Sequence, residues 1–585
     1  MDKRWRIPTH DAGRIEDLAS QASIPSIVAQ LLVARGFYQP KEVACFLDTR
    51  LSGLRDPGEL PGATDAAQRL LAACKAGRRI VIHGDYDADG MTGTAILYLC
   101  LQLIGADVGY HIPNRLEEGY GLSHDTLRSL AERGASLVIS VDCGIASVCE
   151  AETARELGIE LIITDHHEMG NELPQAATIV HPRLPGTHYP FGYLCGAGVA
   201  FKVAWALCQQ ASQAKKVGVP MRNFLMSAMG IAAIGTVADM VPLLDENRIL
   251  VRHGLRSLQD RAQPGLQALM QLTQLDKKSS LSSDDIAFSL APRLNAAGRL
   301  GQAQLGVELL VTESSQRATA LAAYIHELNQ SRVSLERSVQ LAASKQVKET
   351  TDPDQDPALV LAGRGWHAGI IGIVAGRLAE KHNRPVILIS TDTLGSKPGI
   401  GSGRSACGLN LHAALQHCSP HLISHGGHEA AAGLQISEEN IDAFREDFMQ
   451  FAANEINDHS RIPEIHIDAE APLSQLTLST VEQIEQLAPF GQGNPRPVLC
   501  ASCVEVDQPK RMGGGERHLT VRLSQHATRL RAVAFGQGDW AEEMAQLETP
   551  IDVAYRPVIN QFAGRRTVEL HLVDWRPTKV ATSTS

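Results

Sequence analysis

The sequence lacks the features of a membrane-bound or secreted protein. It has no stretch of about 18 or more apolar residues, the length that a membrane-spanning helix needs. Its first residues, MDKRWRIPTHDAGRIEDLA, lack the apolar stretch and small-residue cleavage site of a secretory signal. Its eleven cysteines are scattered, without the spacing of a disulfide framework. We therefore expect a soluble protein of the reducing cytoplasm with no membrane partner.

The sequence also lacks a cysteine-based zinc site and internal repeats. Only Cys500 and Cys503 form a Cys-x-x-Cys pair, and no second Cys or His pair stands at zinc-binding spacing. We interpret these two residues as ordinary thiols. No repeats or low-complexity tracts are visible.

An excess of basic residues is missing as well, since 54 Lys and Arg stand against 65 Asp and Glu, for a net charge of −11. This balance argues weakly against a nucleic-acid partner, because nucleic acids usually meet a basic surface. The charge is unevenly distributed, however, and residues 510–580 hold eleven Lys and Arg against eight Asp and Glu. Divalent metal ions would also neutralise many of the acids discussed below. The net charge alone therefore does not exclude DNA or RNA.

What is present is an ordinary globular composition, with 44% hydrophobic and 20% charged residues. At 585 residues the chain is too long for one core, so we expect three or four folded units. Between residues 79 and 165, strand-like runs such as RRIVIH and SLVISVD alternate with helical patterns such as TGTAILYLCLQLIG. This alternation predicts βαβ units and a parallel sheet.

The rest of the chain shows three further patterns. Helical patterns dominate residues 195–345 and end in a stretch with few helix breakers, which predicts a long connecting helix. After the polar linker TTDPDQDP, an α/β pattern restarts with ALVLAG and PVILIS. From residue 463, runs such as HLTVRL and TVELHLVDW suit a small β-barrel of the OB type. We predict an α/β protein with a helical lead-in (1–50), a parallel-sheet domain (51–315), the connecting helix (316–350), a second α/β domain (351–458) and the OB-type barrel (459–585).

Acidic and histidine residues follow three of the predicted strands. One such Asp alone is common, since Asp often forms turns and caps helices. The carboxyl ends of parallel strands meet at one edge of a sheet, however, and several carboxylates packed there repel one another unless cations are bound. Carboxylate and imidazole ligands suit Mn²⁺ or Mg²⁺, and a pair of ions about 3.5–4 Å apart hydrolyses phosphate esters. The candidate ligands are His83, Asp85, Asp87, Asp89, Asp142, Asp165, His166 and His167.

These motifs resemble those of the DHH phosphoesterase superfamily. HGDYDADG matches the HxxxDxD pattern of that superfamily through His83, Asp87 and Asp89, and VDCG and DHH follow at later strand ends. GTVADMVPL, PRLNAAGR and GWHAGIIGIVAGRL are similar to segments of RecJ-type exonucleases, and SHGGHEAAAG resembles the signature of the DHH-associated domain. The resemblance covers residues 45 to 435 and identifies the two α/β domains as DHH and DHH-associated domains.

The resemblance implies a role for each candidate ligand. It assigns His83, Asp87 and Asp142 to one divalent ion, and Asp142 bridges to the second. The second ion is also bound by Asp89, His166 and Asp239, where Asp239 comes from GTVADMVPL. The remaining residues would orient ligands or assist proton transfer as part of the catalytic machinery, and they are Asp85, Asp165 and His167.

A single DNA strand needs cations for its phosphates and flat side chains for its bases, and Arg115 and Tyr120 supply both types on one loop. By resemblance, Arg115 binds the terminal 5′-phosphate with Ser402 and Arg404, and Tyr120 stacks on a base. Each residue also has an ordinary structural interpretation, as an exposed arginine, a half-buried tyrosine or part of a glycine-rich turn. Phosphates near the cut are assigned by resemblance to Arg299, His367 and His428, and the strand beyond them to Arg556, Arg565 and Arg566.

The resemblance implies a metal-dependent exonuclease that degrades single-stranded DNA from its 5′ end to 5′-mononucleotides, in DNA repair and recombination. It also implies a monomer, with single-strand DNA-binding protein and a RecQ-type helicase as partners. Two other interpretations stay open. One is a DHH phosphodiesterase of short oligonucleotides or cyclic dinucleotides, whose relatives are generally shorter and need no barrel. The other is a non-catalytic single-strand-binding replication scaffold, whose relatives lose the metal ligands that this sequence retains.

Overall fold

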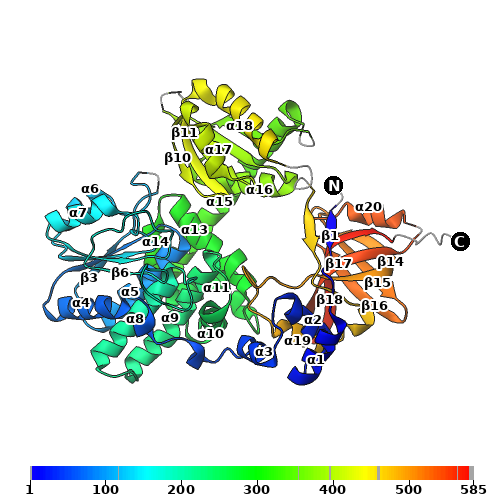
Figure 1. Cartoon of the computed structure of the whole chain (residues 1–585), viewed down its shortest axis with the longest axis horizontal. Helices are drawn as coiled ribbons and strands as arrows, with labels where there is room; N and C mark the ends of the chain where they lie inside the picture. The colour runs from blue at the N-terminus through cyan, green and yellow to red at the C-terminus, as the bar shows by residue number, and fades with distance from the viewer. Residues whose placement is uncertain are drawn as a thin grey trace. The chain divides into compact units, whose positions relative to one another are not determined.

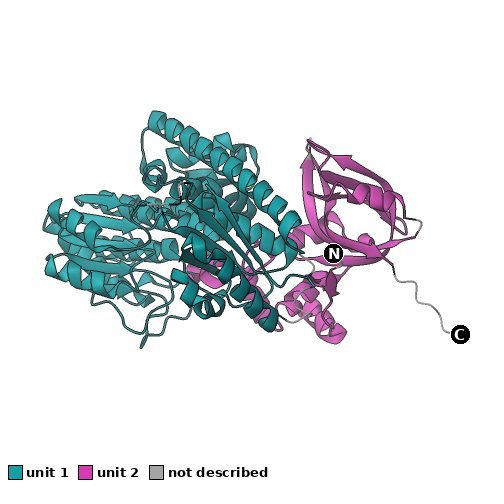
Figure 2. Cartoon of the chain, turned by 90° about the horizontal axis from the view of Figure 1, so that it is seen from above, with its two compact units in different colours: residues 1–2, 54–241, 249–463 teal, residues 3–53, 242–248, 464–585 magenta. Residues whose placement is uncertain are grey.

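The computed structural model describes residues 3–115, 117–352, 355–393, 395, 397–456, 462–547, 549–562 and 564–578. The chain forms two compact units, which Figure 2 distinguishes by colour. Unit 1 comprises residues 1–2, 54–241 and 249–463, and unit 2 comprises residues 3–53, 242–248 and 464–585. Unit 2 thus combines segments from both ends of the sequence.

The first domain of unit 1, where Figure 1 labels β3 and β6, is built on a five-stranded parallel sheet. The strand order is β3-β2-β4-β5-β6. Its central strands β2 and β4 are buried throughout, as their continuous Val/Ile-rich sequences predict. Because β3 pairs on one side of β2 and β4 on the other, the chain reverses direction across the sheet at β2, where ligand sites of such folds usually lie. The strands are β2 (Ile80–Gly84), β3 (Val108–His111), β4 (Leu137–Val141), β5 (Glu160–Thr164) and β6 (Thr178–Val180).

Helices fill the rest of this domain. Helix α5 is buried along most of its length and contacts α8 and α9. A π-helical turn at Ile286–Leu290 separates α12 from α13. The helices are α4 (Ala63–Lys75), α5 (Ala88–Leu103), α6 (His124–Glu132), α7 (Val148–Glu156), α8 (Gly196–Ser212), α9 (Val219–Ala238), α10 (Asp245–Arg261), α11 (Pro264–Leu272), α12 (Ser283–Asp285), α13 (Ala291–Arg299) and α14 (Ala303–Val311).

Within the described part of the chain, α9 is the one helix long and apolar enough to cross a membrane by length and composition. However, 61% of its most apolar window is buried inside the fold. Core helices pass the same test, so α9 is weak evidence for a membrane span.

A 36-residue helix, α15 (Ser315–Thr350), connects the two domains of unit 1. Its first part contacts α11, α13 and α14, and its last part packs against the second domain through Val339, Ala343 and Val347. The second sheet runs in the order β10-β11-β9-β8-β7, and only β7 and β8 are parallel in it. Its elements are β7 (Leu359–Arg364), α16 (Ala368–His382), β8 (Val386–Thr391), β9 (Gly399–Arg404), α17 (Leu411–His417), β10 (Leu422–Gly427), β11 (Ala431–Ile436) and α18 (Ile441–Glu455).

Unit 2 contains a closed five-stranded β-barrel, because β14 pairs with both β15 and β17 and so completes the order β14-β15-β16-β18-β17. All neighbouring pairs are antiparallel except β16–β18, which is parallel, and closure in this order is typical of the OB fold. The strands are β14 (Leu499–Met512), β15 (His518–Gln525), β16 (Thr528–Ala534), β17 (Ile551–Phe562) and β18 (Arg565–Pro577), with helices α19 (Leu478–Glu485) and α20 (Trp540–Ala545) and the short strand β13 (Ala469–Glu470) beside them.

The N-terminal segment belongs to the same unit as the barrel. Apolar residues of α1 and α2, such as Leu18 and Leu31, share one buried cluster with barrel residues such as Val521 and Tyr555. Strand β1 (Arg4–Arg6) pairs in parallel with β12 (Glu464–His466). The helices of this segment are α1 (Ala12–Ala22), α2 (Ser26–Ala34) and α3 (Pro40–Leu47).

Candidate metal centre

The loop after β2 supplies the first group of candidate ligands. His83 is fully buried near the end of the strand, and its Nε2 donates to the carbonyl of Gly121 at 3.1 Å. Asp87 caps α5, because its carboxylate accepts the backbone N–H groups of Asp89 and Gly90. Asp89 in the first helical turn is 1% exposed. Capping therefore fixes the Asp87 side chain and leaves its second carboxylate oxygen available to bind a metal ion.

Asp142 follows β4 in a left-handed conformation, with φ of 64° and 2% exposure. Asp tolerates this conformation better than most residues, and here it turns the side chain toward the end of the neighbouring strand β5. His166 Nε2 lies 3.1 Å from Asp142 Oδ1, 3.6 Å from Asp239 Oδ2 and 3.9 Å from Asp89 Oδ2. Asp239 comes from the end of α9, so four separate segments meet at this imidazole.

Three overlapping groups of side chains have ligand atoms within 4.8 Å of one another, the spacing that metal coordination requires. Asp142 belongs to two of the groups and His166 to two. Overlap of this kind is what a shared two-ion centre needs, because one ligand must then serve both ions. The groups are Asp85–Asp87–Asp142, Asp89–His166–Asp239 and Asp142–His166–His167.

Four buried ligand atoms at this centre have no hydrogen-bond partner among the described residues: His83 Nδ1, Asp85 Oδ1, Asp142 Oδ1 and His166 Nε2. A buried polar atom without a partner is destabilising, and native proteins seldom leave one so. His83 Nδ1 is the lone-pair nitrogen of its ring, because the proton is on Nε2. Divalent cations would satisfy all four atoms, so the residues present fit metal binding.

The electrostatics favour the same conclusion. Burial, reinforced by the neighbouring carboxylates, raises the pKa of Asp85 to about 8 and of Asp239 to about 9, and it raises the pKa of Asp142 well above its usual range. These acids cannot all be ionised at neutral pH without cations. Burial also lowers the pKa of His83 and His166 to about 4, which keeps both rings neutral, as metal ligation requires.

Asp165 and His167 form a separate pair beside this centre. The Asp165 carboxylate accepts His167 Nδ1 at 2.7 Å and the backbone N–H groups of Ile145, His166 and His167. Although burial opposes both effects, these contacts lower the pKa of Asp165 to about 2 and raise that of His167 to about 9. Asp165 therefore organises its own loop, and its contact with His167 favours the protonated form of that ring.

Several residues that position the ligands were not predicted from the sequence. Asp89 accepts the backbone N–H groups of Gly196 and Ala197 at the start of α8, at 2.6 and 2.9 Å. Asn295 accepts the N–H of Ala88 at 2.8 Å and so holds the start of α5. Backbone donors leave no signature in residue type, so the sequence predicted a helix in this region but not its hydrogen bonds to Asp89.

His181 and Arg183 hold the loop of His166 and His167 from behind. The ring of His181 is fully buried and bonds the carbonyl of His167 at 2.9 Å. Arg183 donates to the carbonyl of His166 at 2.7 Å and to Glu168 at 2.6 Å. The run HPR after the last strand of the sheet is the only sequence signal for this support.

Arg115, Arg299 and Arg404 lie near one another at the margin of the centre. Burial lowers the pKa of Arg299 to about 10, and the neighbouring charges of Arg115 and Arg404 add to this effect. None of the three lies within 4 Å of a carboxylate oxygen in the part of the chain described. Arg299 donates to the carbonyl of Gly369, and Arg404 to Ser402 and Gly403. Guanidinium groups gathered without carboxylate partners are suited to bind an anion.

The other predicted contacts are placed as follows. Tyr120 is 53% exposed, and its hydroxyl donates to the carbonyl of Asp142 at 3.1 Å. His367 caps α16 through Nδ1, so its proton is on Nε2 and can be donated. His428 is exposed and lies close enough to Glu168 to lower the pKa of that carboxyl, though less than Arg183 does. The ring of Tyr86, not predicted, lies edge-on to Tyr120 at 6.2 Å.

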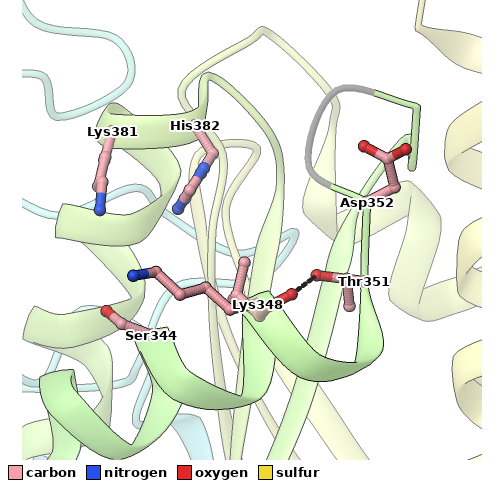
Figure 3. Close-up of a pocket in the computed structure, with 7 residues that line it drawn as sticks. Ser344, Lys348, Thr351, Asp352, Lys381 and His382 are labelled. Carbon is pink, nitrogen blue, oxygen red and sulfur yellow. Dashed lines mark hydrogen bonds between the residues drawn. The ribbon is translucent and has the colours of Figure 1, made fainter.

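A separate hollow of about 500 Å³ lies at the ends of α15 and α16 (Figure 3). It is lined by Lys348, Lys381, His382 and Asp352 among others, and it contains none of the strand-end ligands. Exposed lysines at a surface hollow are common, so we assign this feature no function.

Three protein-family profiles match the chain. They are the N-terminal domain of the DHH family over residues 79–234, the DHHA1 domain over 355–454 and the RecJ OB domain over 467–574. The single-stranded-DNA-specific exonuclease RecJ of Bacillus subtilis is 37% identical, covering 98% of this chain and 70% of that protein. The same exonuclease of Dickeya dadantii is 36% identical, covering 94% and 95%.

The chain belongs to the RecJ family. A crystal structure of RecJ from Thermus thermophilus in complex with Mn²⁺ superposes with a TM-score of 0.82 at 31% identity, over 99% of this chain and 80% of that one. The corresponding complex with Mg²⁺ gives 0.75 at 30% identity, over 99% and 79%. The RecJ resemblance and the predicted fold class are therefore confirmed. The roles of individual residues stay predictions.

Proposed function

We propose that the chain is a metal-dependent exonuclease that hydrolyses single-stranded DNA from its 5′ end to 5′-mononucleotides, in DNA repair and recombination. The observation that carries the proposal is the set of buried, unpartnered ligand atoms at the strand ends of a RecJ-family fold. Family membership at this identity favours it over the small-substrate and scaffold alternatives.

In this proposal, His83, Asp87 and Asp142 hold one ion, and Asp89, Asp142, His166 and Asp239 hold the second. The overlapping ligand groups contain all of these residues except His83, whose buried Nδ1 has no partner among the described residues. The Mn²⁺ and Mg²⁺ complexes of the Thermus relative also support the assignment. When bound, two such ions lower the pKa of water and stabilise charge on the attacking and leaving oxygens. Asp85 belongs to the group Asp85–Asp87–Asp142. Its proposed role is to orient the other two ligands of that group.

Asp165 and His167 have a different proposed role. Asp165 fixes the orientation of the His167 ring, whose Nδ1 is occupied by that hydrogen bond. The hydrogen bond to Asp165 raises the pKa of His167 and so favours its protonated form. We assign to its Nε2 the donation of a proton or hydrogen bond to the phosphodiester during cleavage.

The 5′ end of the strand is proposed to bind at the arginine cluster. Arg115, Ser402 and Arg404 contact the terminal phosphate, and Arg299, His367 and His428 contact the phosphates near the cut. Among the described residues, no carboxylate oxygen lies within 4 Å of these three guanidinium groups, which supports this. Tyr120 offers an exposed ring to a base. A fixed 5′-phosphate would place one phosphodiester at the metal ions, which sets the direction of degradation.

Replacing Arg404 with alanine tests this clamp. We expect KM for a 5′-phosphorylated strand to rise about tenfold or more, because a charge-assisted hydrogen bond contributes about 1.5–3 kcal/mol. KM for a 5′-hydroxyl strand should change little. Arg364→Ala is the matched control, since Arg364 is an exposed arginine of the same domain that pairs with Glu438. An equal loss with both substrates would contradict a 5′-phosphate contact.

The activity itself is tested with the purified chain and 5′-phosphorylated DNA, either single-stranded or as a blunt duplex. We expect mononucleotides from the single strand in Mn²⁺, no reaction with a chelator and an intact duplex. Release of products only from oligonucleotides a few residues long would favour the small-substrate alternative. Binding without cleavage under every condition would favour the scaffold.

The proposed compartment is the cytoplasm, which the eleven free thiols support. We propose that the chain is a monomer. Single-strand DNA-binding protein and a RecQ-type helicase are its proposed partners, because an exonuclease of this kind needs single strands to be exposed. The barrel is proposed to bind DNA, and Arg556 and Arg565 are exposed there. Arg566 pairs with Glu482 at 2.7 Å.

A further inference from the structure

Helix α16 packs against the two residues of the proposed 5′-phosphate clamp that lie on β9, Ser402 and Arg404. A methyl group added at Gly372 would lie 2.9 Å from the Ser402 hydroxyl and 3.0 Å from a guanidinium nitrogen of Arg404. One added at Gly376 would lie 3.8 Å from Arg404 Cγ. Because α16 and the clamp are packed this closely, any movement of α16 would also move the clamp.

The start of α16 is held by the first domain of unit 1. Arg299, at the end of α13, donates to the carbonyl of Gly369 at 3.2 Å. The two backbones also approach closely, since a methyl group at Gly369 would lie 2.7 Å from the carbonyl oxygen of Arg299. We call this contact the first anchor. It fixes one end of α16 and leaves the direction of the helix to be set elsewhere.

A second contact holds α16 further along its length. Arg377 of α16 forms an ion pair with Glu336 of the connecting helix α15, whose side chain is 2% exposed. The other carboxylate oxygen of Glu336 accepts Arg332 Nη1 at 2.8 Å. We call the Glu336–Arg377 pair the second anchor. Since α15 also contacts α11 and α13, both anchors tie α16 to the first domain.

The second anchor is suited to fix geometry more than to add stability. Apolar residues already bury the interface of α15 and α16, among them Val339, Ala343 and Val374. Apolar surfaces can slide on one another, whereas an ion pair holds two atoms at one separation. Burying a charge is costly, so an ion pair often stabilises a fold no more than apolar residues of the same volume do. A buried carboxylate at this interface therefore favours a role in alignment.

We propose that the Glu336–Arg377 pair is a positioning contact that fixes the direction of α16, and with it the separation between the 5′-phosphate clamp and the metal centre. This inference rests on the proposed function and names the contact that aligns its two sites. A strand held by its terminal phosphate presents the scissile bond to the ions only when this separation is correct. Without the second anchor, α16 would be free to turn about the first, and the bound strand would lie out of place.

Replacing Arg377 with methionine in the full chain tests the inference. The change leaves the pair of Glu336 with Arg332 intact, so the buried carboxylate keeps a partner. In Mn²⁺ we expect kcat for a 5′-phosphorylated strand to fall about 100-fold, because misplacing reacting groups by about 1 Å typically costs 10²-fold in rate. KM should stay close to parental, since the clamp residues themselves are unchanged, whereas Arg404→Ala should raise KM.

A 5′-hydroxyl strand provides the comparison that a general loss of structure would fail. Its kcat should fall far less in Arg377→Met, because this strand does not use the clamp and Arg299 stays at the first anchor. Rates are expressed per Mn²⁺-binding equivalent from calorimetry, so a partly unfolded sample cannot imitate the loss.

Two further variants control for the chemistry of the substitution. Arg377→Lys keeps a cation on α16 to pair with Glu336 and should retain most of the parental kcat. Lys345→Met removes an exposed cation that pairs with Glu349 within α15 alone, and it should have no effect. An unchanged kcat in Arg377→Met, or an equal fall with both strands, would overturn the positioning role. If the parent chain cleaves neither strand, the proposed function fails, and this inference fails with it.

Discussion

Exchange of Asp142 for asparagine should reduce the rate of strand degradation by about 10³-fold or more while the protein stays folded. Asp142 is the proposed bridge between the two ions, and it occurs in two of the three ligand groups. Metal ions contribute several kcal/mol of transition-state stabilisation, and about 4 kcal/mol corresponds to 10³ in rate. Asparagine tolerates the left-handed φ of 64° at this position, so the backbone need not change.

The same variant should be more stable than the parent when no metal is present. The Asp142 carboxylate is buried, and four further acids, Asp85, Asp87, Asp89 and Asp239, disfavour its ionisation. A carboxyl whose pKa is raised by folding destabilises the protein as pH rises above the ordinary value, here 3.8. The melting temperature of Asp142→Asn should therefore exceed that of the chelated parent at neutral pH by roughly a few degrees. The difference should vanish at acidic pH, where both side chains are neutral.

Calorimetry and a nuclease assay on the same samples separate these two effects. Isothermal titration should show loss of at least one Mn²⁺ site in Asp142→Asn. Asp125→Asn is the control, because Asp125 has a side chain 96% exposed on α6 and lies outside the cluster. Parental activity in Asp142→Asn would refute the bridging role, and a lower melting temperature without metal would refute the destabilising effect of the buried carboxylate.

The strand-end ligands could be predicted because residue type and position carry the signal. A run of apolar residues ending in Asp or His indicates both the strand and the ligand, as at Asp87 and Asp142. Asp239 could be identified only by its motif, since it follows a helix far along the chain, and the fold alone brings it within 3.6 Å of His166. The DHH tripeptide illustrates a further limit. Its Asp165 looks like a ligand, yet the carboxylate is engaged by its own loop.

Supporting residues were missed for a common reason, namely that their contacts use backbone atoms. Gly196 and Ala197 act through N–H groups, and Arg183 and His181 bind carbonyl oxygens. Any residue type has these backbone groups, so no pattern in the sequence marks them.

Gly196 donates its backbone N–H to Asp89 and also packs tightly against Asp142. Its replacement by alanine should lower kcat by about 100-fold. A methyl group there would lie 2.5 Å from Cβ and 2.7 Å from Cγ of Asp142, closer than real contacts allow. Either the Asp142 side chain or the start of α8 must move, and α8 donates the two hydrogen bonds that hold Asp89. Displacing catalytic groups by about 1 Å typically costs 10²-fold in rate. Overpacking should also destabilise the fold by about 1–3 kcal/mol.

Gly198→Ala provides the matched control from the same helical turn. Its added methyl group would lie 3.4 Å from the nearest atom of Leu194, an ordinary contact, so activity and Mn²⁺ affinity should stay close to parental. Gly196→Ala should instead weaken Mn²⁺ binding in calorimetry. Without metal it should be less stable than the parent, whereas Asp142→Asn should be more stable. Parental Mn²⁺ affinity and kcat in Gly196→Ala would show that the centre tolerates displacement and that tight packing against α8 does not position Asp142 and Asp89.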